Sequence, residues 1–157
     1  MDNFYEQFQT KDYEKIEKTF NIFSKLSLAM AIVFAALLNL VGSMFFILIY
    51  SIIFILSRKI IIEYEYELTG NELSIYKIMN KSKRKEIGNF NIREISSVKT
   101  LDKLGSNTKV TKAYLEESGI KPMVFITKNS NGNRGFQLAM DEKLLDLVKR
   151  VNPLSFY

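Results

Sequence analysis

Charged and apolar residues are unevenly distributed along the chain. From Leu26 through Ser57 no residue carries a charge, whereas Lys25 precedes this stretch and Arg58 follows it. An apolar run of about 18 residues or more is typical of a membrane-spanning helix. As a single helix the stretch would be about 48 Å long, against a hydrocarbon core of about 30 Å. The stretch is therefore too long for one upright crossing and predicts two helices.

The centre of the apolar stretch is its most polar part. Asn39, Gly42 and Ser43 lie there, and these residue types favour a turn. Length and polarity together predict a transmembrane helical hairpin over residues 19–59, with its turn at residues 39–43.

Small side chains recur every four residues along the first predicted membrane helix, at Ser27, Ala31 and Ala35. Such a stripe lets another helix approach closely. The expected partner is the second helix of the same hairpin, and homodimerisation of two chains is the alternative.

Residues 1–25 have an amphipathic pattern. Apolar and aromatic residues recur at intervals of three or four between Phe4 and Phe23, with lysines and glutamates on the other sides. This pattern predicts an amphipathic N-terminal helix. The helix would anchor in the membrane interface by its aromatic side chains, or it would pack on the soluble domain or extend the first membrane helix.

After the hairpin the period of the pattern changes to two. Tyr64, Tyr66 and Leu68 alternate with glutamates, which predicts a strand, and Gly70 begins a tight turn. Further strands are expected up to Met140, including a single strand over residues 91–101. A polar loop at residues 101–109 and a turn at residues 129–133 separate the later strands.

The chain ends with a helical period. Asp141 is a suitable N-cap, and apolar residues recur at helical spacing until Pro153 stops the pattern. A helix is therefore predicted over residues 141–152. About seven antiparallel strands followed by one amphipathic helix is the layout of a pleckstrin-homology-like (PH-like) barrel or curled sheet, here over residues 60–157.

Three segments carry a family resemblance: MDNFYEQ at the start, EYEYELTGNELSIYKIMNKSKRKEI at the first strands, and FQLAMDEKLLDLVKRVNP near the end. With these segments the chain resembles a family of small Firmicutes membrane proteins of unknown function. The resemblance implies a short charged N-terminus, a membrane hairpin and a PH-like domain, and it implies no activity. The expected fold class is an α+β membrane protein.

Composition excludes several kinds of chemistry. The chain has no cysteine and no histidine, which excludes disulfides, zinc sites built from these residues, cysteine nucleophiles and histidine-based triads. Glu63, Glu65 and Glu67 alternate along one strand and are expected to form an exposed acidic face. No glycine-rich phosphate loop stands out. We therefore expect no enzyme activity, no catalytic or metal-binding residues and no cofactor.

The net charge of +5 is concentrated after the hairpin. Residues 1–25 carry four Lys against five Asp or Glu, whereas residues 58–157 carry eighteen Lys or Arg against twelve. A basic domain tethered to a membrane is attracted to anionic headgroups, which makes nucleic acid the weaker candidate partner. The densest basic cluster consists of Lys77, Lys81, Lys83, Arg84 and Lys85. It is interpreted as a headgroup contact or as a solvated turn.

The positive residues on both sides of the apolar stretch favour a hairpin with both termini in the cytoplasm, because lysine and arginine collect on that side of a membrane. The sequence thus indicates a multi-pass protein of the cell membrane. The leading hypothesis for its function is a membrane-anchored PH-like interaction module that binds a protein partner or its own copies. The alternative is a protein that binds anionic lipid headgroups.

Overall fold

A computed structural model describes residues 4–104, 108–129 and 132–156 of the chain. The chain divides into two compact units, each described by itself. The helical unit consists of Asp12–Ile62 with Met79–Lys83. The β unit consists of Met1–Lys11, Glu63–Ile78 and Arg84–Tyr157.

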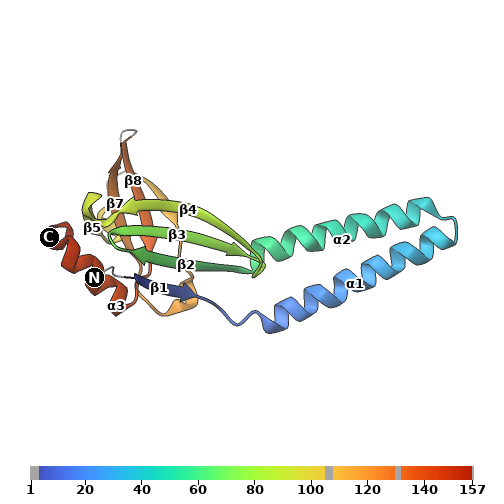
Figure 1. The fold of residues 1–157 in the computed structure, drawn as a ribbon. Coiled ribbons are helices and arrows are strands. Elements are labelled where there is room, and N and C mark those ends of the chain that lie inside the picture. The colour runs from blue at the N-terminus through green and yellow to red at the C-terminus, as the bar shows by residue number, and fades with distance from the viewer. Residues whose placement is uncertain (1–3, 105–107, 130–131, 157) are drawn as a thin grey trace. The chain divides into compact units, whose positions relative to one another are not determined.

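Figure 1 labels most of the helices and strands. In chain order the helices and strands are β1 (Phe4–Gln9), α1 (Glu14–Ala36), α2 (Leu40–Ile60), β2 (Ile62–Thr69), β3 (Glu72–Met79), β4 (Lys83–Asn91), β5 (Ile95–Lys99), β6 (Lys109–Lys112), β7 (Met123–Asn129), β8 (Gly132–Leu138) and α3 (Glu142–Val151). Short 3₁₀ helices are η1 (Ile92–Glu94), η2 (Leu101–Lys103), η3 (Glu116–Ser118) and η4 (Pro153–Phe156).

The helical unit contains two apolar helices, as the sequence predicts. Both α1 and α2 are long and apolar enough to cross a membrane. They lie side by side as an antiparallel pair, with most of their apolar side chains exposed (Figure 1). The turn between them falls at residues 37–39, slightly earlier than expected, because the Asn39 side chain caps α2 by accepting a hydrogen bond from the Gly42 N–H at 2.9 Å.

Small residues form part of the contact between α1 and α2. Ser27 and Ala31 are buried, whereas Ala35 of the same stripe is exposed. Near the turn Gly42 lies against the ring of Phe34, where an added Cβ would come within 2.5 Å of the ring. The helices therefore approach closely because glycine and small side chains leave space between them.

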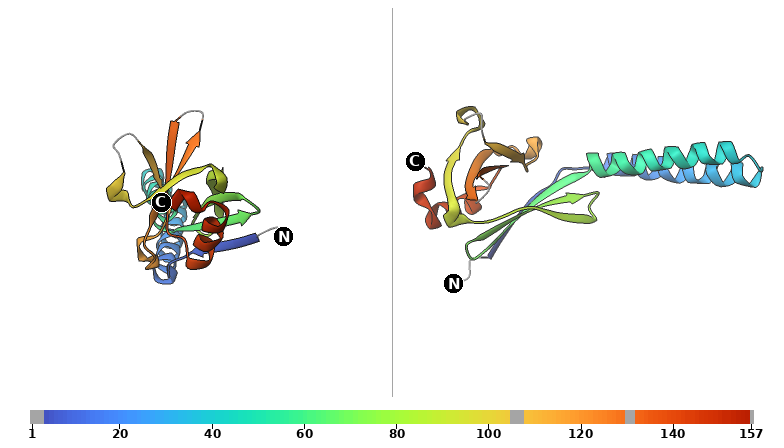
Figure 2. Two further views of the ribbon diagram at one scale, coloured as in Figure 1. Left: turned by 90° about the vertical axis from the view of Figure 1, so that its left-hand side faces the viewer. Right: turned by 90° about the horizontal axis from the view of Figure 1, so that it is seen from above.

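The β unit contains two four-stranded sheets, in the orders β1-β2-β3-β4 and β5-β7-β8-β6. Neighbouring strands in the second sheet are antiparallel except for β6 and β8, which are parallel. The sheets are not closed into a barrel, and Figure 2 shows α3 beside the second sheet. The strand predicted over residues 91–101 is present as β5 but is shorter, because residues 92–94 form η1. Asn91 starts η1 by accepting a hydrogen bond from the Arg93 N–H, and this turn separates β4 from β5.

The N-terminal helix predicted over residues 1–25 is wrong for residues 4–9, which form β1. This strand pairs antiparallel with β2, so that Phe4 lies opposite Thr69 and Gln9 opposite Tyr64. The spacing of the aromatic residues fits a helix as well as a strand. Tertiary pairing decides for the strand, because its alternate residues Gln7 and Gln9 are buried and hydrogen-bonded within the β unit.

The C-terminal helix agrees with the prediction. Asp141 is its N-cap and accepts a hydrogen bond from the Leu144 N–H at 2.8 Å. Leu144 and Val148 are buried, and the core of the β unit also includes Tyr66, Phe125 and Phe136. Parts of the predicted loop at 101–109 and of the predicted turn at 129–133 lie outside the described residues.

Candidate functional site

The turn between β3 and β4 is bound to the start of the hairpin within the helical unit. Asn80 and Lys81 both have positive φ angles, 50° and 52°, as the two central residues of a tight β-turn. The Asn80 N–H donates to the Ile61 carbonyl at 2.8 Å, just beyond the end of α2. Lys81 Nζ lies 2.6 Å from Glu17 Oε2, in the first turn of α1.

This turn brings cations to the open end of the hairpin. Lys81 and Lys83 are exposed and belong to the helical unit, together with Arg58 and Lys59 in the last turn of α2. Lys15 and Lys18 lie in the early part of α1. The helical unit therefore has a cationic end where the long apolar helix surfaces begin. Such an arrangement suits the boundary between hydrocarbon and an anionic surface.

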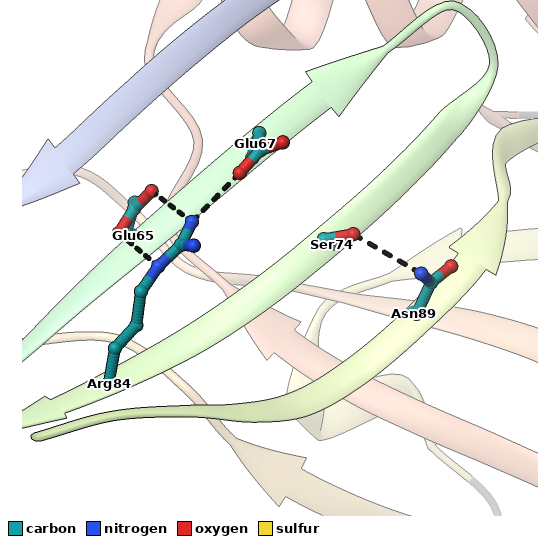
Figure 3. A network of polar contacts seen from close by, with 5 residues as sticks. All are labelled: Glu65, Glu67, Ser74, Arg84 and Asn89. Carbon is teal, nitrogen blue, oxygen red and sulfur yellow. Dashed lines mark hydrogen bonds and ion pairs between the residues drawn. The ribbon is translucent and has the colours of Figure 1, made fainter.

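Arg84 is held by carboxylates of the sheet. From β4 its guanidinium passes over the Tyr76 ring of β3, at 3.5 Å from the ring centroid, and reaches β2. There it makes two hydrogen bonds to Glu65 and one of 2.8 Å to Glu67 (Figure 3). These carboxylates raise the pKa of the Arg84 guanidinium, mainly through the hydrogen bonds that Arg84 donates to Glu65. The positive charge of Arg84 is thus paired with carboxylates of β2.

The structure divides the five residues of the predicted basic cluster into groups. Lys81 and Lys83 belong to the helical unit, whereas Lys77, Arg84 and Lys85 belong to the β unit. Lys77 is half-buried and Lys85 is exposed. That the five residues contact lipid headgroups stays a prediction. The carboxylate partners of Lys81 and Arg84 come from distant positions, 17, 65 and 67, which the local sequence does not reveal.

The acidic strand face expected at Glu63, Glu65 and Glu67 is not uniformly exposed. Glu65 is only 5% exposed. Its carboxylate lies with those of Glu6 and Glu67, and one oxygen from each falls within 4.8 Å of the others. A metal ion at these three carboxylates would compete with the guanidinium of Arg84. The arrangement is therefore explained as an ion-pair network that ties β4 to β2.

A second feature, absent from the sequence reasoning, is a hollow of about 430 Å³ in the β unit. It lies where β5, η2, the start of β7 and η4 meet. Its lining residues are Val98, Lys99, Thr100, Lys103, Met123 and Phe156. They come from three distant parts of the sequence. Only the segment VKTLDK contains several of them, and its sequence is not a recognisable motif for a binding site.

Comparison with known proteins gives one family. A family model described as a bacterial PH-like domain (DUF6106) matches residues 1–157. No curated protein and no solved structure matches the chain.

Proposed function

The chain belongs to the bacterial PH-like domain family DUF6106, and from this premise we propose that it is a membrane-anchored interaction module on the cytoplasmic face of the cell membrane. The confirmed resemblance to a PH-like family of unknown function supports a role in binding. In this proposal the hairpin crosses the membrane twice, and the β unit binds a protein partner or another copy of the chain.

The exposed apolar surface of the hairpin carries the proposal. Along α1 and α2 large apolar side chains point outward, for example Ile32 at 63% exposure, Val41 at 81% and Leu48 at 59%. Within an apolar 18-residue segment of each helix, only 11% of the segment is buried in α1 and only 6% in α2. A water-soluble protein does not expose an apolar surface of this extent. Lipid chains can cover this apolar surface, and the backbone N–H and C=O groups are already hydrogen-bonded within the helices.

The charge distribution supports the cytoplasmic orientation. Lysines precede α1 or lie in its first half, Arg58 and Lys59 end α2, and the turn at residues 37–39 is uncharged. Both ends of the hairpin then face the cytoplasm and the turn faces outward. The absence of native cysteine makes this orientation directly testable.

The test uses two single-cysteine variants in intact cells. Val41→Cys replaces a residue that is 81% exposed in the first turn of α2, and Asn133→Cys replaces an exposed residue of β8. A membrane-impermeant maleimide should label Val41→Cys in intact cells, and should label Asn133→Cys only after lysis. Labelling of Asn133→Cys in intact cells would contradict the cytoplasmic orientation. A stoichiometric protein, or a second copy of the chain, in mild detergent extracts would support the interaction role.

Contact with anionic lipid headgroups is a second candidate function. The observation that favours it is the pair of exposed lysines, Lys81 and Lys83, beside the cationic end of the hairpin. Each such residue near an anionic surface contributes on the order of 1 kcal/mol. Amide exchange at residues 79–83 should then be slower in nanodiscs that contain phosphatidylglycerol than in phosphatidylcholine nanodiscs. The double variant Lys81→Gln/Lys83→Gln should abolish the difference, and equal exchange in both lipids for the native chain would refute this candidate.

A further inference from the structure

The strand β1 lies at the edge of its sheet. In the order β1-β2-β3-β4 it is a terminal strand with β2 as its neighbour (Figure 1). In an antiparallel pair, every second residue of a strand points its backbone N–H and C=O groups away from the neighbouring strand. Within the described part of the chain, the hydrogen bonds of the β1 main chain are those of its pair with β2. The outer edge of β1 can therefore pair with a further strand.

One face of β1 is attached to the rest of the β unit. Side chains alternate along a strand, so Tyr5, Gln7 and Gln9 share this face. Gln7 and Gln9 are buried, and their side-chain amides both donate to the Ala139 carbonyl. The Tyr5 hydroxyl donates to the Asp141 carboxylate at 2.6 Å. These contacts hold β1 on the β unit, so that a partner would meet a strand edge that is already formed.

The opposite face of β1 exposes two aromatic rings. Phe4, Glu6 and Phe8 share this face, and Phe4 is 61% exposed and Phe8 55%. Among the described residues of the β unit, the other large apolar side chains with such exposure are Leu101 and Leu154. An edge strand that exposes two aromatic rings offers a surface that another chain can pair with and cover.

The same face of β1 adjoins an excess of negative charge. Glu6 lies opposite Glu67 in the β1–β2 register, and carboxylate oxygens of Glu6, Glu65 and Glu67 lie within 4.8 Å of one another. Arg84 donates to Glu65 and Glu67, and the described residues give Glu6 no cationic partner. Three carboxylates thus share one guanidinium. A strand placed beside β1 would be stabilised by a Lys or Arg opposite Glu6 and by apolar side chains opposite the two rings.

A second copy of β1 does not meet this requirement. An antiparallel copy centred on Glu6 keeps the aromatic rings on one face, but it places the two Glu6 carboxylates opposite each other, where like charges are unfavourable. An extended basic segment of another protein instead supplies main-chain groups for the edge, apolar side chains and positive charge.

We propose that the outer edge of β1 binds an extended basic segment of a partner protein. The segment adds to the sheet as a further strand beside β1. It places a Lys or Arg side chain beside Glu6 and apolar side chains beside Phe4 and Phe8. The inference rests on the proposed role as an interaction module and specifies the surface and chemistry of that interaction.

The test uses the full-length protein in phosphatidylcholine nanodiscs, because β1 precedes the hairpin and belongs to the β unit. The probe is a pool of fluorescent, terminally capped seven-residue peptides with Lys or Arg at the centre, Val or Phe two positions away on each side, and Ser or Thr elsewhere. One matched pool has Asp or Glu at the centre, and another has every backbone amide N-methylated. Anisotropy gives the affinity, and amide exchange of residues 4–9 reports strand addition.

The basic pool should bind and slow amide exchange in β1. Glu6→Lys should weaken this binding by about fivefold or more and should gain affinity for the acidic pool, a gain that a misfolded variant would not show. The control Glu94→Lys makes the same charge change at an exposed position of η1 and should leave affinity within about twofold. The N-methylated pool should not bind, because it lacks the amide donors that pair with the strand edge.

The aromatic rings provide a second pair of variants. Phe4→Ala/Phe8→Ala should weaken binding of the basic pool by about fivefold or more, because the apolar side chains of the peptide lose their cross-strand contacts. The control Leu101→Ala/Leu154→Ala removes two exposed apolar side chains away from β1 and should leave affinity within about twofold.

Three results would overturn the proposal for the β1 edge: equal loss of binding in Glu6→Lys and Glu94→Lys, equal binding of the N-methylated peptides, or no peptide binding. Self-association in detergent that Glu6→Lys changes, without peptide binding, would also overturn it and assign the edge to a second copy of the chain. If peptides do not bind but a stoichiometric partner is recovered from cells, the proposed interaction role stands and its surface lies elsewhere. If no partner is recovered but the basic pool binds as expected, the β1 edge stands without that support.

Discussion

Arg84 and Glu65 are joined by two hydrogen bonds across an intervening strand, from Arg84 Nε at 3.0 Å and from an Arg84 terminal nitrogen at 2.5 Å. Glu65 is buried, whereas the Arg84 side chain is 46% exposed. The Tyr76 ring of β3 lies beneath the guanidinium. A cation in the most basic segment of the chain thus neutralises a buried carboxylate in the sheet.

Arg84→Gln should lower the free energy of unfolding by about 2–3 kcal/mol, because it leaves the buried Glu65 carboxylate without its charged partner. Thermal unfolding in detergent micelles measures this loss. The matched control Lys85→Gln changes an exposed neighbour and should stay within about 0.5 kcal/mol of the native protein. In the double variant Arg84→Gln/Glu65→Gln part of the stability should return. Strict additivity of the two single changes would contradict the ion pair.

Gln9→Ala should destabilise the β unit by about 1–3 kcal/mol. Gln9 Oε1 accepts from the Leu115 N–H at 3.0 Å, and its amide donates to the Ala139 carbonyl, so alanine leaves two polar backbone groups without this partner. Phe8→Ala in the same strand is the control, because Phe8 is 55% exposed and its loss creates no cavity. Equal shifts of the unfolding midpoint in both variants would argue against the strand assignment of residues 4–9.

Tyr66 should make the fold sensitive to alkaline pH. Burial raises the pKa of its hydroxyl above the ordinary value of 10.0, so the folded state favours the protonated form. This contribution to stability is complete below pH 10 and is lost as the pH rises through the folded pKa. Unfolding midpoints measured from pH 7 to pH 12 should therefore fall at the alkaline end.

Tyr66→Phe provides the check on that pH dependence. The hydroxyl donates to the Ala113 carbonyl and accepts from the Ala139 N–H at 3.3 Å, so its removal should cost about 1–3 kcal/mol at neutral pH. The same change should make the alkaline decline shallower, because the titrating group is gone. Tyr114→Phe, a change outside this contact, should leave the neutral-pH midpoint unchanged. An alkaline decline of equal steepness in Tyr66→Phe would show that another group causes it.

The sequence by itself determined the parts of the protein in which local pattern is sufficient. The uncharged stretch from Leu26 to Ser57 required two helices because of its length, and its polar centre indicated a turn at residues 39–43, close to the observed turn at 37–39. The alternation after Ile60 indicated a strand with Tyr64, Tyr66 and Leu68 buried, and Asp141 indicated a local helix cap. These features depend on residues close in sequence, so they could be read without a structure.

Only the tertiary structure decided which distant residues meet. Residues 4–9 form a strand because their partners lie more than fifty residues away. The backbone pairs with β2, and the buried side chains of Gln7 and Gln9 bond to Ala139 and Leu115. Within the basic segment Lys81 pairs with Glu17, whereas Arg84 is held by Glu65. The hollow of the β unit joins side chains from positions 98 to 156. These contacts join residues that are far apart in the sequence. The spacing of apolar and polar residues along the chain therefore does not reveal them.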